Sequence, residues 1–127
     1  MKEKEVQIED LLGKIIISIE GNIGDDVMTI YTSDNNQYRL YHDQDCCENV
    51  DIQDIVGDLN DLLNTPILQA EEITNNDDTF GKIEYPDSFT WTFYKLATIK
   101  GYVTISWLGE SNGYYSESVS IVKYIND

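Results

Sequence analysis

The last forty residues constrain the fold most strongly, because apolar and polar side chains alternate along them. The alternating stretches are 88–100, 102–108 and 117–125. A period of two is typical of strands that bury one face, and Gly101 provides a turn between the first two stretches. The pattern therefore predicts an antiparallel meander in which Phe89, Trp91 and Phe93 face the core.

Shorter strands are predicted in the earlier part of the chain. β-branched or alternating stretches next to Gly or turn-forming residues predict strands at 14–21, 27–32, 37–42 and 67–74. Residues 33–36 favour a turn, so the second and third of these strands should form a hairpin. The polar residues 1–10 are expected to fray or to dock loosely, and 75–87 to form a long polar loop.

A helix is predicted at 51–63, where apolar residues recur with the spacing of one helical face. They are Ile52, Ile55, Val56, Leu59, Leu62 and Leu63. Asp51 is a suitable N-cap, and the helix should end before Pro66. No internal repeat or linker is visible, so the expected fold class is α+β. One domain over 1–127 would pack an antiparallel sheet of about six strands against this helix.

The net charge limits the partners that the chain can bind. The sequence has 24 acidic and 8 basic residues, for a formal net charge of -16. Nucleic acids and anionic membranes are themselves polyanions, so we expect neither to be a direct ligand. Residues 43–87 hold 13 of the acids and one base, Lys82, which concentrates the charge in the middle third of the chain.

On the predicted helix, four aspartates would point outward in one row. They are Asp51, Asp54, Asp58 and Asp61. At ~1.5 Å of rise per residue, successive carboxylates would lie roughly 5 Å apart, which is of the order of the phosphate spacing in a nucleic-acid strand. A solvated face that keeps the protein soluble is one interpretation, and a surface that presents charge to a partner is the other.

Further residues are candidates for the same partner surface. Asp45 and Glu48 lead into the predicted helix, and Tyr114 and Tyr115 lie in a loop after the second strand of the meander. Tyrosine contributes contact area at a low cost in conformational entropy, so the two tyrosines are expected as anchors.

The only histidine and both cysteines lie close together, as His42, Cys46 and Cys47. Their spacing matches no zinc-finger pattern, and a catalytic Cys–His pair would need a third, orienting group. We therefore expect these residues to pack, with both thiols reduced, because adjacent cysteines rarely close a disulfide. We expect no metal, no cofactor and no enzyme, since no nucleotide-binding or hydrolase motif occurs. Weak calcium binding at 75–78 is a lesser alternative.

Two segments resemble a family of small proteins of unknown function found in phages and prophages. They are YHDQDCCENVDIQDIVGDLNDLLNTPILQAEE (41–72) and SFTWTFYKLATIKGYVTISWLGESNGYYSESV (88–119). The resemblance covers about half of the chain and implies a phage or prophage origin, with action inside a bacterial host. It implies no particular catalytic or binding residue.

These observations favour an acidic phage-type inhibitor that blocks the nucleic-acid-binding groove of a host defence protein, of the anti-CRISPR or anti-restriction type. Its partner would be a basic, nucleic-acid-handling protein. The alternatives are a protein that sequesters a small signalling nucleotide and a phage accessory protein whose acidity serves solubility alone. No apolar run has the length of a membrane span or a signal peptide, so we expect a cytoplasmic location.

Overall fold

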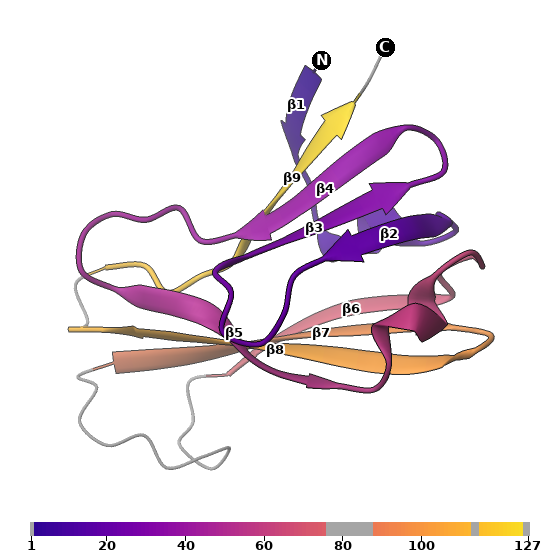
Figure 1. Ribbon diagram of the computed structural model, residues 1–127. Helices are drawn as coiled ribbons and strands as arrows, with labels where there is room; N and C mark the ends of the chain where they lie inside the picture. Colours follow the sequence, from indigo (N-terminus) through magenta and orange to yellow (C-terminus); the bar gives the residue numbers. More distant parts are fainter. Residues whose placement is uncertain (1, 76–87, 113–114, 126–127) are drawn as a thin grey trace.

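The structure is a computed structural model that describes residues 2–75, 88–112 and 115–125. Two antiparallel sheets face each other across one core (Figure 1). The first has the order β1-β9-β4-β3-β2, and the second has the order β5-β8-β7-β6. The first comprises β1 (Lys2–Glu5), β2 (Ile16–Glu20), β3 (Val27–Thr32), β4 (Asn36–Tyr41) and β9 (Ser120–Ile125). The second comprises β5 (Asn49–Val56), β6 (Gln69–Asn75), β7 (Ser88–Thr98) and β8 (Gly101–Ser111).

The chain crosses from one sheet to the other twice. After β4 it leaves the first sheet through residues 42–48 and enters β5, and after β8 it returns to β9. Two short 3-10 helices, η1 (Ile8–Leu11) and η2 (Leu59–Leu62), lie between strands. Within the described residues, no helix is long and apolar enough to cross a membrane.

Side chains from both sheets fill the core. Its largest fully buried members include Trp107, Tyr38, Tyr94, Ile30, Ile52 and Leu62. Each sheet contributes alternate residues of its strands, as expected for sheets that bury one face. The core therefore depends on which of the two residue sets each strand turns inward.

The predicted α+β fold is wrong, because no α-helix forms at 51–63. Residues 49–56 are strand β5, and the only helical turn nearby is η2. A bulge between Ile52 and Asp54 turns both Ile52 and Ile55 toward the core, at a spacing of three rather than two. The 3-10 turn adds Leu59 and Leu62, again three apart. A bulged strand followed by a 3-10 turn thus imitates the spacing of a helical face.

Gly57 shows why a strand and not a helix forms here. Its φ of +103° is outside the helical range, and a Cβ at this position would lie 2.4 Å from the carbonyl oxygen of Tyr102. Glycine also lowers the stability of a helix interior by about 1 kcal/mol relative to alanine. Gly57 therefore ends β5 and allows the chain to turn toward η2.

The orientation predicted for the first strand of the meander is also wrong. In β7 the inward residues are Thr92, Tyr94 and Leu96, all of which are buried. Because neighbours along a strand point to opposite faces, Trp91 and Phe93 lie on the outer face of the second sheet, where they remain half-buried. Phe89 shares that face by register. The outward set is the more aromatic of the two, so the hydrophobicity of alternate residues predicts the wrong face of β7.

The predicted strand positions are otherwise close to those observed. Strands at 14–21, 27–32, 37–42, 67–74, 88–100, 102–108 and 117–125 correspond to β2, β3, β4, β6, β7, β8 and β9. Of the residues expected to fray or to dock loosely, Lys2–Glu5 pairs with β9 as β1. The loop predicted at 75–87 lies largely outside the described residues.

Substitution of Ile52 and Val56 tests the strand against the helix. A helix would bury both residues in one stripe, whereas in β5 Ile52 is fully buried and Val56 is 60% exposed. Ile52→Ala should lower the free energy of unfolding by about 2–5 kcal/mol. Val56→Ala should lower it by less than about 1 kcal/mol. Urea denaturation measures both, and equal losses would contradict the strand.

Candidate functional site

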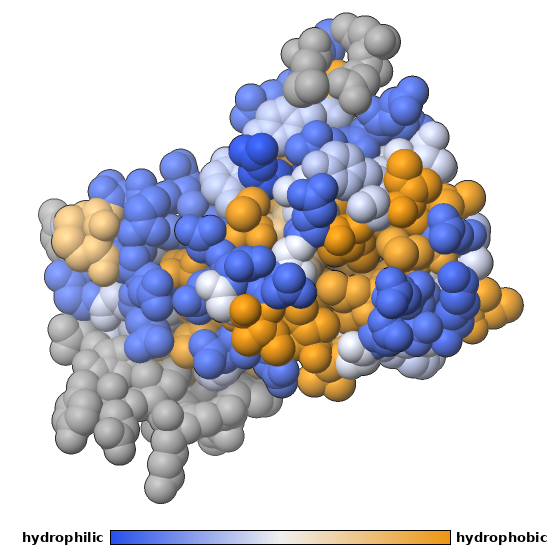
Figure 2. Space-filling model, in the orientation of Figure 1, coloured by the Kyte–Doolittle hydropathy of each residue, from blue (hydrophilic) through white to orange (hydrophobic). Residues whose placement is uncertain are grey.

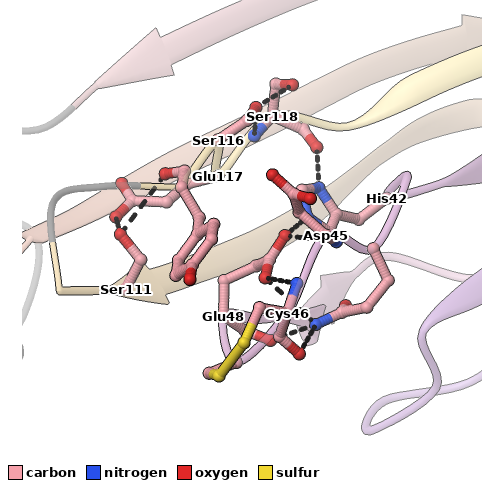
Figure 3. A network of polar contacts seen from close by, with 11 residues as sticks. His42, Asp45, Cys46, Glu48, Ser111, Ser116, Glu117 and Ser118 are labelled. Carbon is pink, nitrogen blue, oxygen red and sulfur yellow. Dashed lines mark hydrogen bonds and ion pairs between the residues drawn. A yellow bond between two sulfur atoms is a disulfide. The ribbon is translucent and has the colours of Figure 1, made fainter.

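A buried carboxylate organises the segment that joins β4 to β5. Glu48 accepts hydrogen bonds from the backbone amides of Asp45 (2.9 Å) and Cys46 (2.8 Å) and from the side chain of Gln44 (Figure 3). His42 Nε2 lies 2.7 Å from Glu48 Oε2, and both side chains are buried. The charge of Glu48 is therefore satisfied inside the protein, so its carboxylate is not available to a partner.

His42 connects this segment to the one that returns from β8 to β9. Its Nδ1 lies 2.7 Å from the carbonyl oxygen of Ser118. Both neighbours of the ring, the Ser118 carbonyl and the Glu48 carboxylate, can only accept hydrogen bonds at neutral pH. The ring of His42 thus bridges the two segments in which the chain changes sheets.

The surroundings of Glu48 hold its carboxyl group in the ionised form. Burial raises its pKa, but the hydrogen bond with His42 and those from the backbone of Cys46 and Asp45 lower it more strongly. The resulting pKa is about 2, compared with an ordinary value of 4.5. Hydrogen bonds to the charged form are thus the dominant effect.

A second buried carboxylate, that of Glu117, lies on the neighbouring segment. It accepts hydrogen bonds from the hydroxyl groups of Thr90 (2.8 Å) and Ser111 (2.5 Å). Beside it is a hollow of about 250 Å³. The hollow is lined by Glu72, Thr74, Thr90, Thr92, Ser116, Glu117, Ser118 and Val119. This end of the molecule therefore has a polar interior, which explains why two threonines of β7 point inward.

The expectation of two reduced thiols is wrong in this structure, where a disulfide joins Cys46 and Cys47. Both cysteines are exposed, and the backbone of Cys46 is held by Glu48 and Gln44. Among the described residues, no group of three or more His, Cys, Asp or Glu side chains is arranged to hold a metal ion. The expectation that no metal binds stays a prediction.

The structure separates the four aspartates of the predicted row. Asp51 and Asp54 lie on the outer face of β5, opposite Leu108 and Ser106 of β8. Along a strand, three residues span about 10 Å, so the carboxylates are roughly twice as far apart as on a helix. Burial, together with the nearby Asp26, raises the pKa of Asp51, whereas a hydrogen bond with Asn49 lowers it less.

The other two aspartates belong to the turn around η2. Asp58 accepts a hydrogen bond from the amide of Asn60 (2.9 Å) and caps η2. Asp61 is half-buried, and its backbone carbonyl accepts a hydrogen bond from Thr98. The four carboxylates therefore do not reproduce the spacing of a phosphate chain.

The remaining candidates lie at the opposite end of the second sheet. Asp45 is exposed in the segment 42–48, and Tyr115 is half-buried in the segment that leads to β9. Tyr114 lies outside the described residues. The structure thus brings Asp45 and Glu48 together, but it places both far along the sheet from η2.

Sequence reasoning missed the outer face of the second sheet. A shallow hollow of about 470 Å³ lies there over β7 and β8. It is lined by Val56, Ile73, Phe93, Lys95, Thr104 and Ser106. Next to it the rings of Trp91 and Phe93 stack, with their centroids 5.8 Å apart. The aromatic alternation of β7 is the sign of this face in the sequence, but alternation does not say which residue set points outward.

Exposed apolar side chains continue at the end of the molecule that holds η2 and the β7–β8 turn. They include Val56, Leu68, Ile99 and Tyr102. Figure 2 shows apolar residues gathered toward this end of the visible face, interrupted by a cluster of polar residues, and mostly polar residues toward the other end. The outer face of the second sheet is thus apolar at its centre and adjoins an apolar end.

The cations that a phosphate-binding pocket would need are dispersed. Arg39 lies over the ring of Tyr124 in the first sheet, and Lys123 pairs with Asp10 at 3.1 Å. Lys100 donates to the carbonyl oxygen of Leu63, and Lys95 lines the hollow on the second sheet. Two cations therefore do not converge with Trp91 or Tyr115, the arrangement expected of a nucleotide-sequestering protein.

Because the pKa of Glu48 is lowered, the free energy of unfolding should depend on pH in the acidic range. Because the folded pKa is lower than that of the unfolded chain, the stabilisation is complete above about pH 4.5 and is lost as the pH falls toward about 2. Glu48→Gln should lower the free energy of unfolding at neutral pH and flatten its decrease over this interval. Urea denaturation at a series of pH values measures this, with the exposed Glu20→Gln as control. An unchanged acid dependence in Glu48→Gln would contradict the assignment.

Comparison with protein families shows one match, over residues 9–121, to a family described as a domain of unknown function, DUF7448. No curated protein and no solved structure matches the chain. Because the match covers most of the sequence, the chain belongs to the DUF7448 family.

Proposed function

We propose that the chain is a phage-type binding protein that acts in the cytoplasm of a bacterial host and covers a basic surface of a nucleic-acid-handling defence protein. The observation that carries the proposal is the outer face of the second sheet. It combines a mainly apolar hollow, which Lys95 also lines, with carboxylates on the same face, at Asp51 and Asp54. Within the described residues, neither carboxylate takes part in a salt bridge.

The arrangement of this face has the anatomy of a protein interface. Interfaces place aromatic and apolar side chains at the centre, where most of the binding energy arises, and polar or charged groups around them. Here Phe93 lies at the centre, Ile73 lies beside it on β6, and Asp54 lies at the border toward β5. A small hollow between them suits one apolar side chain of a partner.

The charge of the whole molecule supports a basic partner. A net charge of -16 repels polyanions and attracts cationic surfaces over distances of about a Debye length, which is ~8–10 Å at physiological salt. Grooves that hold nucleic acid are cationic because the phosphate backbone is a polyanion, and the same charge would repel this acidic chain. The aspartates of β5 thus act as scattered charges at the border of an apolar face, and they do not form a helical mimic of a phosphate chain.

Charge reversal on β5 tests this function. Asp51→Lys combined with Asp54→Lys should weaken capture of a basic protein from a bacterial lysate by at least about tenfold. Capture by the unchanged chain should also fall between about 0.05 M and 0.5 M salt, since the attraction is electrostatic. DNA or RNA added to the complex should compete with the chain for the captured protein.

The matched control is Glu3→Lys combined with Glu5→Lys. These residues are exposed on β1 in the first sheet, so the control changes the net charge equally without touching the proposed face. Equal capture by both double variants, or capture that salt and nucleic acid leave unchanged, would rule out the proposed function. An accessory protein with an acidic surface for solubility alone would give that result.

A further inference from the structure

The second sheet ends at β6, and among the described residues no further strand pairs with the outer side of β6. An edge strand points the N–H and C=O groups of every second residue away from its single neighbour, and proteins usually protect such an edge with charge, proline, a bulge or a covering loop. β6 has no proline, and its register with β7 runs without a bulge from Gln69 to Asn75. Glu71 to Thr74 are all exposed.

The other three sheet edges of the described chain are protected. β1 has only four residues, with the sequence KEKE. β2 contains a bulge, and its start forms bridges with Leu63 and Pro66. β5 also contains a bulge, and the loop before β3 covers it, because the amide and the carbonyl of Ile52 both form hydrogen bonds with that loop. β6 is longer than β1 and has neither a bulge nor a proline, so the charges of Glu71 and Glu72 and the packing of η1 are its protection.

The charges of β6 define what can pair with this edge. Glu71 lies on the outer face and Glu72 on the inner face, so an added strand would meet a carboxylate on both sides. A second copy of the chain is a poor occupant, since registers centred on either glutamate place like charges opposite each other and both copies carry a charge of -16. A strand with lysine or arginine on both faces is the complementary occupant.

We propose that β6 binds an extended basic segment of a partner protein, which adds a fifth strand to the second sheet. Backbone hydrogen bonds would supply much of the affinity, and side chains on alternate positions would supply the selectivity. Ile73 follows the two glutamates and lines the outer hollow, so an apolar residue of the segment would pack beside Phe93. This inference rests on the proposed function and deepens it by naming how the partner is held.

The experiment uses the full chain and a synthetic peptide of seven residues, the length of β6. Lysine occurs among valine and threonine in the peptide at both odd and even positions, so that cations lie on both faces. Amide hydrogen exchange should slow by at least about tenfold within Glu71–Thr74 when the peptide binds, because its backbone pairs with the open edge. The amides of β1 and β2 should exchange as before.

Two controls separate strand pairing from general attraction between charges. A peptide of the same sequence with alternate backbone nitrogens methylated keeps its charge but cannot pair with a strand, so it should lose the protection. The variant Glu71→Lys with Glu72→Gln should bind the original peptide at least about tenfold more weakly. Glu3→Lys with Glu5→Gln changes the net charge equally on β1 and should bind normally.

Three results would each overturn the inference: no peptide binding, equal protection by the methylated peptide, or unchanged binding by the β6 variant. Failure here is distinguishable from failure of the proposed function, which is tested on β5. If the β5 variant no longer captures the lysate partner and the peptide does not protect β6, the proposed function stands and this inference is wrong. Protection of β6 with no effect of the β5 variant removes the proposed function and retains strand pairing at β6.

Discussion

The arrangement of the two sheets depends on the hydrogen bonds around the buried carboxylate of Glu48. It gathers the segment 42–48 around itself through two backbone amides, and the imidazole of His42 connects it to Ser118 in the other segment that changes sheets. A buried charge is costly unless every hydrogen-bonding position is filled, so this geometry tolerates little variation. The apolar core attracts the two sheets without specifying direction, whereas this network fixes how β5 and β9 enter them.

The residues of β7 that point into the core determine which of its side chains lie on the outer face of the second sheet. Tyr94 and Leu96 enter the core, and at the polar end Thr90 and Thr92 can point inward because Glu117 and neighbouring hydroxyl groups surround them. With period two, this choice places Trp91 and Phe93 outside. The outward position of these half-buried aromatic side chains is therefore a consequence of the polar interior, which a count of apolar residues does not reveal.

The strands could be predicted from the sequence, but their faces and the candidate site could not. Alternation located β3, β4, β7 and β8 because a strand imposes it locally. The prediction of a helix at 51–63 was wrong because a bulge and a 3-10 turn reproduce a spacing of three. Gly57 was the one residue in this stretch that favoured another structure. The contact of His42 with Ser118 joins residues 76 positions apart, so no local sequence pattern predicts it. Which side of β7 faces inward depends on the same long-range contacts.

The concentration of charge in the middle third acquires a different meaning in a sheet. On a helix the aspartates would form one dense row. In the sheet, Asp51 and Asp54 lie toward the β5 edge and Glu71 lies on the β6 edge, with a mainly apolar hollow between them on the outer face. Charges about 10 Å apart along a strand cannot reproduce a phosphate chain in detail. They can still raise the rate of encounter with a cationic surface, because steering depends on the summed field. The position of a bound partner would then be set by the hollow and by the open backbone of β6, where contacts are short and directional.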